Sequence, residues 1–264
     1  VESRGLGDVY KRQPLDRAPE RAEEIRAFTR AVDGNPALAL AYVTGRSLQL
    51  ATLGVEEFAL PPADFLAVDV GTRVFRRTPE GYAPDLAYDE RMTEAVGGVE
   101  LAKVSGVLDD ISELQIQPAW GQGRFKRSYF VDPSVPEAEL VERARELIEA
   151  EGGRVALVTS HDPVRDVGLL DILPHGVAKD VAVRHLREIT GVARDQVVYA
   201  GDSGNDMAAF LAGFAGIVVG NAPEALKERL RRAHADGGDS TRLFFAEAPF
   251  SGGVLEGLRH YGVA

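Results

Sequence analysis

The amino-acid sequence predicts an α/β protein with a mostly parallel sheet and an inserted α+β region. From Gly176 onward, strand-like apolar segments alternate with segments of helical periodicity, which is typical of βαβ units. The middle of the chain mixes strand-like and helix-like segments without that regular alternation. We therefore predict a core domain made of residues 1–80 and 172–264, with residues 81–171 inserted as a cap domain.

The first part of the core begins with a helical pattern over Ala18–Val32, followed by the nearly all-apolar stretch Ala37–Val43. Apolar runs of this kind suit strands that are buried on both faces of a parallel sheet. RSLQLATLGV is expected to form a helix, and Asp64–Phe75 two strands joined by a glycine turn. A wound α/β domain should also have a strand before its first helix, but the opening VESRGLGDVYKRQPLD has no apolar run.

The predicted cap contains a strand, helix and strand in the stretch KRSYFVDPSVPEAELVERARELIEAEGGRVALVTS. Ser134 and Glu137 have the spacing of a capping box at the start of this helix. An apolar stripe that includes Leu140 and Ala144 gives the helix one buried face. GLLDILP then ends the region at Pro174.

The second part of the core starts with GVAKDVAVRHLREIT, which is typical of a helix. Three strand-to-helix units follow it, in QVVYAGDSGNDMAAFLAG, AGIVVGNAPEALKERLRRA and TRLFFAEAPFSGGVLEGLRHYG. Each unit places polar residues directly after an apolar strand.

The composition excludes several classes of function. A formal net charge of −11 argues against nucleic acid or an anionic membrane surface as a partner. The chain has no cysteine, which excludes disulfide and thiolate chemistry and fits a cytoplasmic location. No stretch approaches the roughly eighteen apolar residues of a membrane-spanning helix. A small molecule is therefore the expected partner, and the oligomeric state is left open.

Polar residues gather at one predicted edge of the sheet. Because ligands of open parallel sheets bind beyond the carboxyl ends of the strands, we expect these residues to meet there. Carboxylates and an amide are ligands for Mg²⁺, whereas a hydroxyl, Lys and Arg hold phosphate. Each residue alone also has a structural interpretation as a helix cap, a surface lysine or a turn. The residues are Thr44, Gly45, Arg46, Lys179, Asp202, Asn205, Asp206 and Asn221.

Three stretches, YVTGRS, DILPHGVAKDVAVRHL and VVYAGDSGNDMAAF, resemble motifs two, three and four of the haloacid dehalogenase (HAD) superfamily, in that order. The cap inserted between the second and third motifs fits a type IIB member. FLAVDVGTRVF, FKRSYFVDP and FSGGVLEGLRHYG add a resemblance to the sucrose-phosphate phosphatase group, from about Leu15 to the C-terminus. The resemblance implies a Rossmann-like core and a magnesium-dependent phosphatase that works through an aspartyl-phosphate intermediate. The implied substrate is a phosphorylated sugar, such as sucrose 6-phosphate or a related disaccharide phosphate.

The resemblance also implies roles for the residues that match its motifs. Thr44 would hold the transferring phosphoryl group by its hydroxyl, with Gly45 and Arg46 beside the same phosphate. Lys179 would neutralise charge on the nucleophile and on the phosphoryl oxygens, and Asn205 would complete the site.

The resemblance further implies a magnesium site and a catalytic set. Asp202 would bind Mg²⁺, and Asp206 would either bind the same ion or orient Lys179. The implied catalytic residues in this chain are Thr44, Lys179 and Asp202.

The first motif of the family does not occur in the sequence. That motif is an apolar strand ending in Asp-x-Asp-x-Thr, whose carboxylates act as nucleophile and general acid/base. Asp8 has no apolar strand before it, and Asp16 is not followed by the rest of the motif. We interpret residues 1–13 as a non-native, adaptor-like segment, with the native chain resuming near Pro14. The printed chain is therefore expected to be inactive.

Two alternatives remain open. The chain could be a non-catalytic sugar-phosphate-binding domain, like the phosphatase-like tail of some sucrose-phosphate synthases. It could also be a mannosyl-phosphoglycerate phosphatase or another HAD-type sugar phosphatase. Cap residues decide between substrates, and the sequence does not rank Lys126, Arg127 and Tyr129 as sugar contacts.

Overall fold

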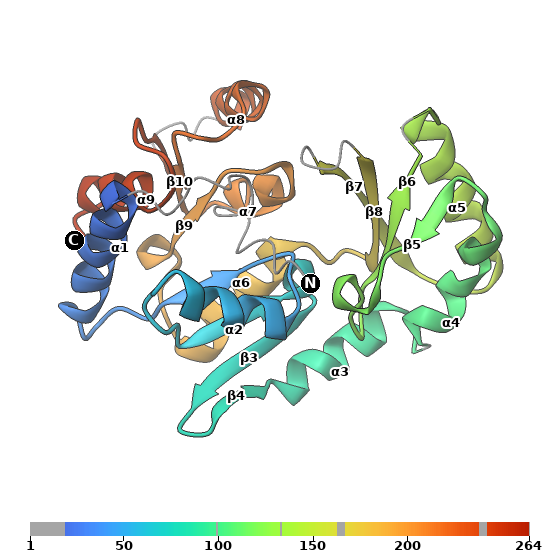
Figure 1. Ribbon diagram of the computed structural model, residues 1–264, viewed down its shortest axis with the longest axis horizontal. Helices are drawn as coiled ribbons and strands as arrows, with labels where there is room; N and C mark the ends of the chain where they lie inside the picture. Colours follow the sequence, from blue (N-terminus) through green and yellow to red (C-terminus); the bar gives the residue numbers. More distant parts are fainter. Residues whose placement is uncertain (1–18, 99, 133, 163–166, 238–241, 264) are drawn as a thin grey trace.

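A computed structural model describes residues 19–98, 100–132, 134–162, 167–237 and 242–263 of the chain (Figure 1). Within these ranges the strands form three sheets, with the orders β1-β2-β3-β4, β11-β10-β9 and β5-β6-β8-β7. Helices and sheets alternate as predicted, so the α/β class is confirmed. No helix in these ranges is both long and apolar enough to cross a membrane. Asp8, Asp16 and the rest of the opening segment lie outside the described residues.

The first sheet comes from the first part of the core. β1 and β2 are parallel, whereas β3 and β4 continue the sheet antiparallel. The predicted glycine turn between two strands is confirmed, because the chain turns between β2 and β3 at Asp69–Gly71. The elements are α1 (Pro19–Asp33), β1 (Ala41–Val43), α2 (Leu48–Glu57), β2 (Phe65–Val68), β3 (Arg73–Thr78) and β4 (Gly81–Pro84).

The second sheet comes from the second part of the core and is wholly parallel, as the alternating pattern predicts. α9 packs against α1, so the two ends of the described chain lie side by side (Figure 1). The elements are α6 (Lys179–Thr190), β9 (Val198–Gly201), α7 (Met207–Phe210), β10 (Ala215–Val218), α8 (Glu224–Gly237), β11 (Leu243–Phe245) and α9 (Phe250–His260).

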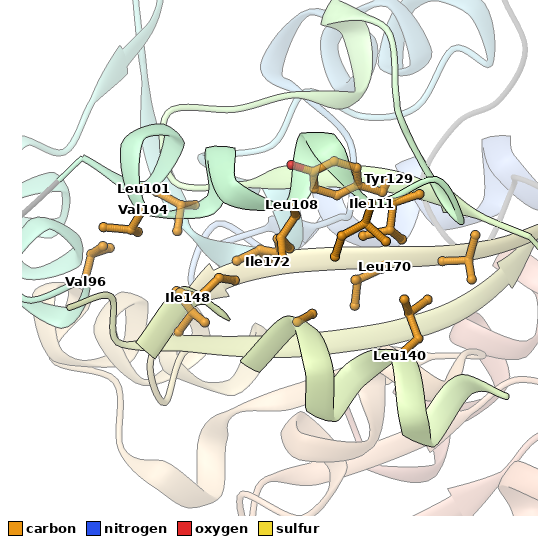
Figure 2. Close-up of a cluster of buried hydrophobic side chains, with 14 residues drawn as sticks. Val96, Leu101, Val104, Leu108, Ile111, Tyr129, Leu140, Ile148, Leu170 and Ile172 are labelled. Carbon is orange, nitrogen blue, oxygen red and sulfur yellow. The ribbon is translucent and has the colours of Figure 1, made fainter. Parts of the chain in front are cut away.

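The third sheet is antiparallel and lies on the opposite side of the molecule from α1 and α9 (Figure 1). Its hydrophobic cluster joins β6 and β8 to helices, with Leu140 and Ile148 from α5 and the fully buried Tyr129 from β6 (Figure 2). The elements are α3 (Leu86–Ala95), α4 (Leu101–Ser105), β5 (Leu114–Ile116), β6 (Arg127–Val131), α5 (Glu137–Ala150), β7 (Val155–Asp162) and β8 (Val167–Pro174).

Two local predictions need correction. The capping box at Ser134 is wrong, because Pro136 is the N-cap of α5 and the Ser134 hydroxyl donates to Asp132 instead, at 2.7 Å. The sequence analysis also missed α3, α4 and β5 inside the inserted region. These elements are short or weakly patterned, so they are defined by packing against the third sheet and not by their own periodicity.

The predicted domain boundaries do not coincide with the ends of the sheets. β4 pairs with β3, so the first sheet continues beyond Gly81, where the predicted cap begins. β8 similarly runs on to Pro174, beyond the predicted end of the cap at Asp171. The division into core and cap domains stays a prediction, to which the structure adds a separate antiparallel sheet within residues 114–174.

The first and second sheets are separated by a cavity of about 470 Å³. Its lining includes residues of β1 and β9, together with side chains from α1, α6 and α9. Protein interiors are otherwise closely packed, with few voids larger than a water molecule. A closed, empty cavity of this volume would cost on the order of 10 kcal/mol, comparable to the whole stability of a typical domain.

Candidate active site

The loop after β1 is held in place by backbone bonds to the loop after β2. The Thr44 amide donates to the Ala67 carbonyl at 2.8 Å, and the Arg46 carbonyl accepts from the Asp69 amide at 2.8 Å. Thr44 is buried, and its Oγ1 accepts a 3.3 Å hydrogen bond from the Arg46 amide across the half-buried Gly45. The Thr44 hydroxyl proton therefore stays available to a ligand oxygen.

Lys179 forms a buried ion pair with Asp206. The two side chains are 1% and 2% exposed, and Lys179 Nζ lies 2.8 Å from Asp206 Oδ1. Lys179 is the first residue of α6, and Tyr199 from β9 donates its hydroxyl to the same Asp206 oxygen at 2.5 Å. The ammonium group of Lys179 is thereby fixed at the carboxyl end of β9.

Both carboxylate oxygens of Asp206 accept hydrogen bonds from the protein. Oδ1 accepts from Lys179 and Tyr199, while Oδ2 accepts from the amides of Asp202 and Ser203 at 3.1 and 2.9 Å. The Ser203 hydroxyl adds a third bond to Oδ2, at 3.0 Å. Of the two roles that the sequence analysis leaves open for Asp206, this arrangement supports the orientation of Lys179.

Asp202 lies one residue beyond β9, and it is buried. Its Oδ2 accepts a 2.6 Å hydrogen bond from Asn221 Nδ2, and Asn221 Oδ1 accepts from the Phe250 amide at 2.8 Å. Asn221 therefore connects Asp202 to the start of α9, a role that its position after β10 hints at but does not specify. Asn205 Oδ1 accepts from the Ser203 hydroxyl at 2.5 Å.

Carboxylate and amide oxygens, the donors that magnesium prefers, lie at this edge of the sheets. Within the described ranges, no group of three or more His, Cys, Asp or Glu residues is arranged to hold a metal ion. Asp202 nevertheless offers a buried carboxylate, with the side-chain amide of Asn205 three residues along the same loop. Magnesium commonly binds proteins through only one or two carboxylates and retains several waters. The oxygen donors present therefore fit the ion that the sequence analysis predicts.

Asp69 is a further buried carboxylate at this edge, and sequence reasoning missed it. It follows β2 directly, is 4% exposed and has a φ of 52°, and Val70 has a φ of 64°. Burial raises the pKa of Asp69 to about 6, although the positive charges of Lys126 and Arg73 act in the opposite direction. No described residue donates a hydrogen bond to Asp69 Oδ1. Two successive non-glycine residues in the left-handed region mark a strained turn, which often occurs at functional sites.

The loop before β6 brings the third sheet against Asp69. A Cβ at Gly123 would lie 2.6 Å from Asp69 Oδ2, so only glycine permits this close approach. Lys126, three residues further on, is buried, and its Nζ lies 3.9 Å from Asp171 Oδ1 in β8. Asp69, Lys126 and Asp171 therefore form a charged cluster between the first and third sheets.

Arg127 and Tyr129, the other two cap residues that the sequence does not rank as sugar contacts, form hydrogen bonds within the third-sheet region. The Tyr129 hydroxyl donates to Asp109 Oδ1 at 2.7 Å and accepts from Arg127 Nε at 2.6 Å. Tyr129 is also part of the buried cluster of the third sheet (Figure 2). Of the three candidates, only Lys126 joins the cluster with Asp69.

Two curated relatives are similar to this chain over most of its length. The chain is 33% identical over 234 residues to a HAD-like hydrolase of Nitrosococcus oceani, a match that covers 86% of this chain and 62% of that protein. The chain thus spans slightly less than two thirds of that relative. It is also 31% identical over 249 residues to the mannosylfructose-phosphate phosphatase of Agrobacterium fabrum, covering 92% of this chain and 91% of that enzyme.

The fold is similar to that of the sucrose-phosphatase from Synechocystis sp. PCC6803, whose structure was solved in complex with sucrose and phosphate. The TM-score is 0.74, with 23% identity over 91% of this chain and 92% of that one. A family model of sucrose-6F-phosphate phosphohydrolases matches residues 15–262. The resemblance inferred from the motifs is confirmed, and the chain belongs to the sucrose-6F-phosphate phosphohydrolase family, which consists of HAD-type phosphoric monoester hydrolases.

Proposed function

We propose that this site binds a disaccharide phosphate, such as sucrose 6-phosphate, for magnesium-dependent hydrolysis to the free sugar and inorganic phosphate. The observation that supports this most is the meeting of Thr44, Lys179 and Asp206 on the lining of one cavity, although they come from separate elements. A hydroxyl and a buried ammonium group on the lining of the same cavity suit a phosphoryl group.

In the phosphate half of the proposed site, Thr44 donates its hydroxyl to a phosphoryl oxygen, beside Gly45 and the buried Arg46. Lys179, held by Asp206, offsets the charge on the phosphoryl oxygens. Asp202, with Asn205 nearby, would hold magnesium, which supplies further positive charge to those oxygens when it is bound.

The chemistry proposed is two displacements at phosphorus. A carboxylate oxygen attacks phosphorus, the bond from phosphorus to the sugar oxygen breaks, and that oxygen takes up a proton. Water then attacks the phosphorus of the acyl phosphate, releasing inorganic phosphate and restoring the carboxylate. The two described carboxylates after β9 already have other proposed roles, since Asp202 would hold magnesium and Asp206 orients Lys179, so the attacking carboxylate is a further group.

In the sugar half of the proposed site, Asp69, Lys126 and Asp171 bind hydroxyl groups. Asp69 Oδ1 is a buried acceptor with no donor among the described residues, and a sugar hydroxyl is a suitable donor. The cluster also lies where the core meets the third sheet, so a substrate there would contact both parts of the molecule.

Calorimetry of the 264-residue chain in the presence of Mg²⁺ tests this proposal. Sucrose 6-phosphate is expected to bind more tightly than sucrose or inorganic phosphate, because only it fills both halves of the site. Lys126→Ala is expected to weaken sucrose 6-phosphate binding about tenfold or more without changing phosphate binding. Lys103→Ala, at an exposed lysine, serves as the matched control. Equal affinities for sucrose 6-phosphate and phosphate would argue against a sugar-phosphate site.

The same chain is expected to release negligible phosphate from sucrose 6-phosphate with Mg²⁺, because no motif in it supplies the attacking carboxylate. A phosphate-release assay with and without a chelator measures this directly. Magnesium-dependent turnover by these residues would show that another carboxylate of the chain acts as nucleophile.

A further inference from the structure

α3 follows β4 along the chain and contacts both β3 of the first sheet and β8 of the third (Figure 1). Its first turn is attached to the core. The Tyr88 hydroxyl donates to the Gly71 carbonyl at 2.7 Å, and Tyr88 is fully buried. At the start of the helix, Asp85 Oδ2 lies 2.8 Å from His185 Nε2 in α6. α3 is therefore fixed to the core beside the turn that holds Asp69.

The next residue of α3, Asp89, is a buried carboxylate that binds two arginines. Its side chain is 4% exposed. Arg73 Nε and Nη2 donate to its two oxygens at 3.2 and 3.0 Å, and Arg124 Nη1 donates to Oδ2 at 3.1 Å. Arg73 begins β3, soon after the turn that holds Asp69, whereas Arg124 belongs to the loop before β6. One carboxylate therefore joins the two segments that meet at the sugar half of the proposed site.

Arg124 lies in a tight turn formed by residues 123–126, the 123–126 turn. The Gly123 amide donates to the Lys126 carbonyl at 2.9 Å, and the Lys126 amide donates to the Gly123 carbonyl at 3.3 Å. Arg124 and Phe125 occupy the two central positions. Phe125 is buried in a hydrophobic cluster that includes side chains of α3. The turn is thus attached to α3 by an ion pair and by apolar packing.

The two ends of the 123–126 turn are the residues that approach Asp69. A Cβ at Gly123 would lie 2.6 Å from Asp69 Oδ2. At the other end, the positive charge of Lys126 acts on the pKa of Asp69. A displacement of the turn would therefore change both contacts at once. Groups that bind a ligand in one geometry depend on supporting contacts of this kind to hold them in place.

We propose that Asp89 is a positioning residue for the sugar half of the proposed site, which it controls without touching the substrate. Through its two arginines it fixes the 123–126 turn on one side and β3 on the other. Lys126 and Asp69 thereby face the same sugar hydroxyl groups. The inference rests on the proposed function for its ligand, a disaccharide phosphate, but not for the contacts that hold the turn.

Calorimetry with Mg²⁺ tests the positioning role, with sucrose 6-phosphate and inorganic phosphate as the two probes. Arg124→Ala is the main variant, because this side chain is 58% exposed and its removal leaves Arg73 paired with Asp89. It is expected to weaken sucrose 6-phosphate binding about tenfold and to leave phosphate binding unchanged. Arg91→Ala removes another exposed arginine beside the same helix face contacts, its ion pair with Glu188, and is the matched control that should change neither affinity.

A double variant separates positioning from a general loss of stability. Asp89→Asn keeps the size of the side chain but removes its charge, so it should weaken sucrose 6-phosphate binding at least as much as Arg124→Ala. The two substitutions combined should weaken it no more than Asp89→Asn alone, because they break the same contact. Unchanged sucrose 6-phosphate binding in Arg124→Ala, equal weakening of both probes, or additive effects would each overturn the positioning role.

Hydrogen exchange without ligand tests the same contacts independently of the proposed function. In Arg124→Ala, the amides of Gly123 and Lys126 are expected to exchange at least tenfold faster, while those of α3 keep their rates. Unchanged exchange in the turn would overturn the claim that Asp89 fixes it. If the turn responds but the unmodified chain binds sucrose 6-phosphate no more tightly than phosphate, the proposed function is wrong. The sugar-positioning role then falls with it, whereas the attachment of the turn to Asp89 is confirmed.

Discussion

At the residue scale, the site depends on charges that are withdrawn from water. Lys179 and Asp206 are almost completely buried, and each is tolerated because the other is present. Tyr199 and the amides of the loop after β9 satisfy the remaining lone pairs of Asp206. A buried pair of this kind fixes geometry more than it adds stability, which suits a group that must hold a phosphoryl oxygen.

Removing Lys179 is expected to destabilise the chain strongly. Lys179→Met leaves the Asp206 carboxylate buried without its counter-charge, so the free energy of unfolding should fall by about 3 to 5 kcal/mol. Equilibrium urea unfolding measures the change. Arg184→Ala, which breaks an exposed ion pair with Asp180, is the matched control, and its effect should stay within about 0.5 kcal/mol. Similar effects for both variants would contradict the importance of burial here.

Asp69 is expected to make stability depend on pH. Burial raises its folded-state pKa to about 6, above its ordinary value of 3.8. The folded state therefore binds this proton more tightly, so the stabilisation is complete below pH 3.8 and is lost as the pH rises through about 6. The free energy of unfolding of Asp69→Asn, measured relative to that of the unmodified chain, should be about 2 to 3 kcal/mol higher at pH 8 than at pH 4. Urea unfolding at both pH values measures this, and a difference that does not change with pH would contradict it.

At the element scale, strands were recognised where they are continuously apolar and helices where one face is apolar. β9, β10 and α6 fall where their patterns place them, because each is buried in the way that its pattern implies. β1 is shorter than the apolar run that predicts it, since only Ala41–Val43 pair with β2. The sequence pattern therefore predicts which segments are buried. The length of a strand depends in addition on which neighbouring strand it pairs with.

The contact of α9 with β10 gives an element-scale prediction. A Cβ at Gly257 would lie 2.3 Å from Ile217 Cγ1, so the helix packs unusually closely on the strand. Gly257→Ala should lower the free energy of unfolding by about 1 to 3 kcal/mol through overpacking.

The double variant Gly257→Ala with Ile217→Ala supplies the control for that contact. Removing the Ile217 atoms makes room for the new methyl group, so the double variant should be more stable than the sum of the single effects implies. Additive effects in urea unfolding would show that Ile217 is not what limits the approach of α9.

At the scale of the whole molecule, the cavity between the first and second sheets should bind apolar dyes. Its lining is dominated by aliphatic and aromatic side chains from helices on both faces. The native chain is therefore expected to enhance the fluorescence of anilinonaphthalene sulfonate, which reports accessible apolar surface. If the native chain does not enhance the fluorescence of the dye, the dye does not enter the cavity.

The sequence by itself determined the α/β class, the inserted region and the residues that follow β1 and β9, because apolar periodicity and strand-end position are local properties. Family membership could also be inferred from the motifs that contain Thr44, Lys179 and Asp202. Only the tertiary structure showed that both Asp206 oxygens are occupied, that Asp69 meets Lys126, and that two strand edges face one cavity. These facts depend on contacts between residues far apart in the chain, and no local pattern encodes such contacts.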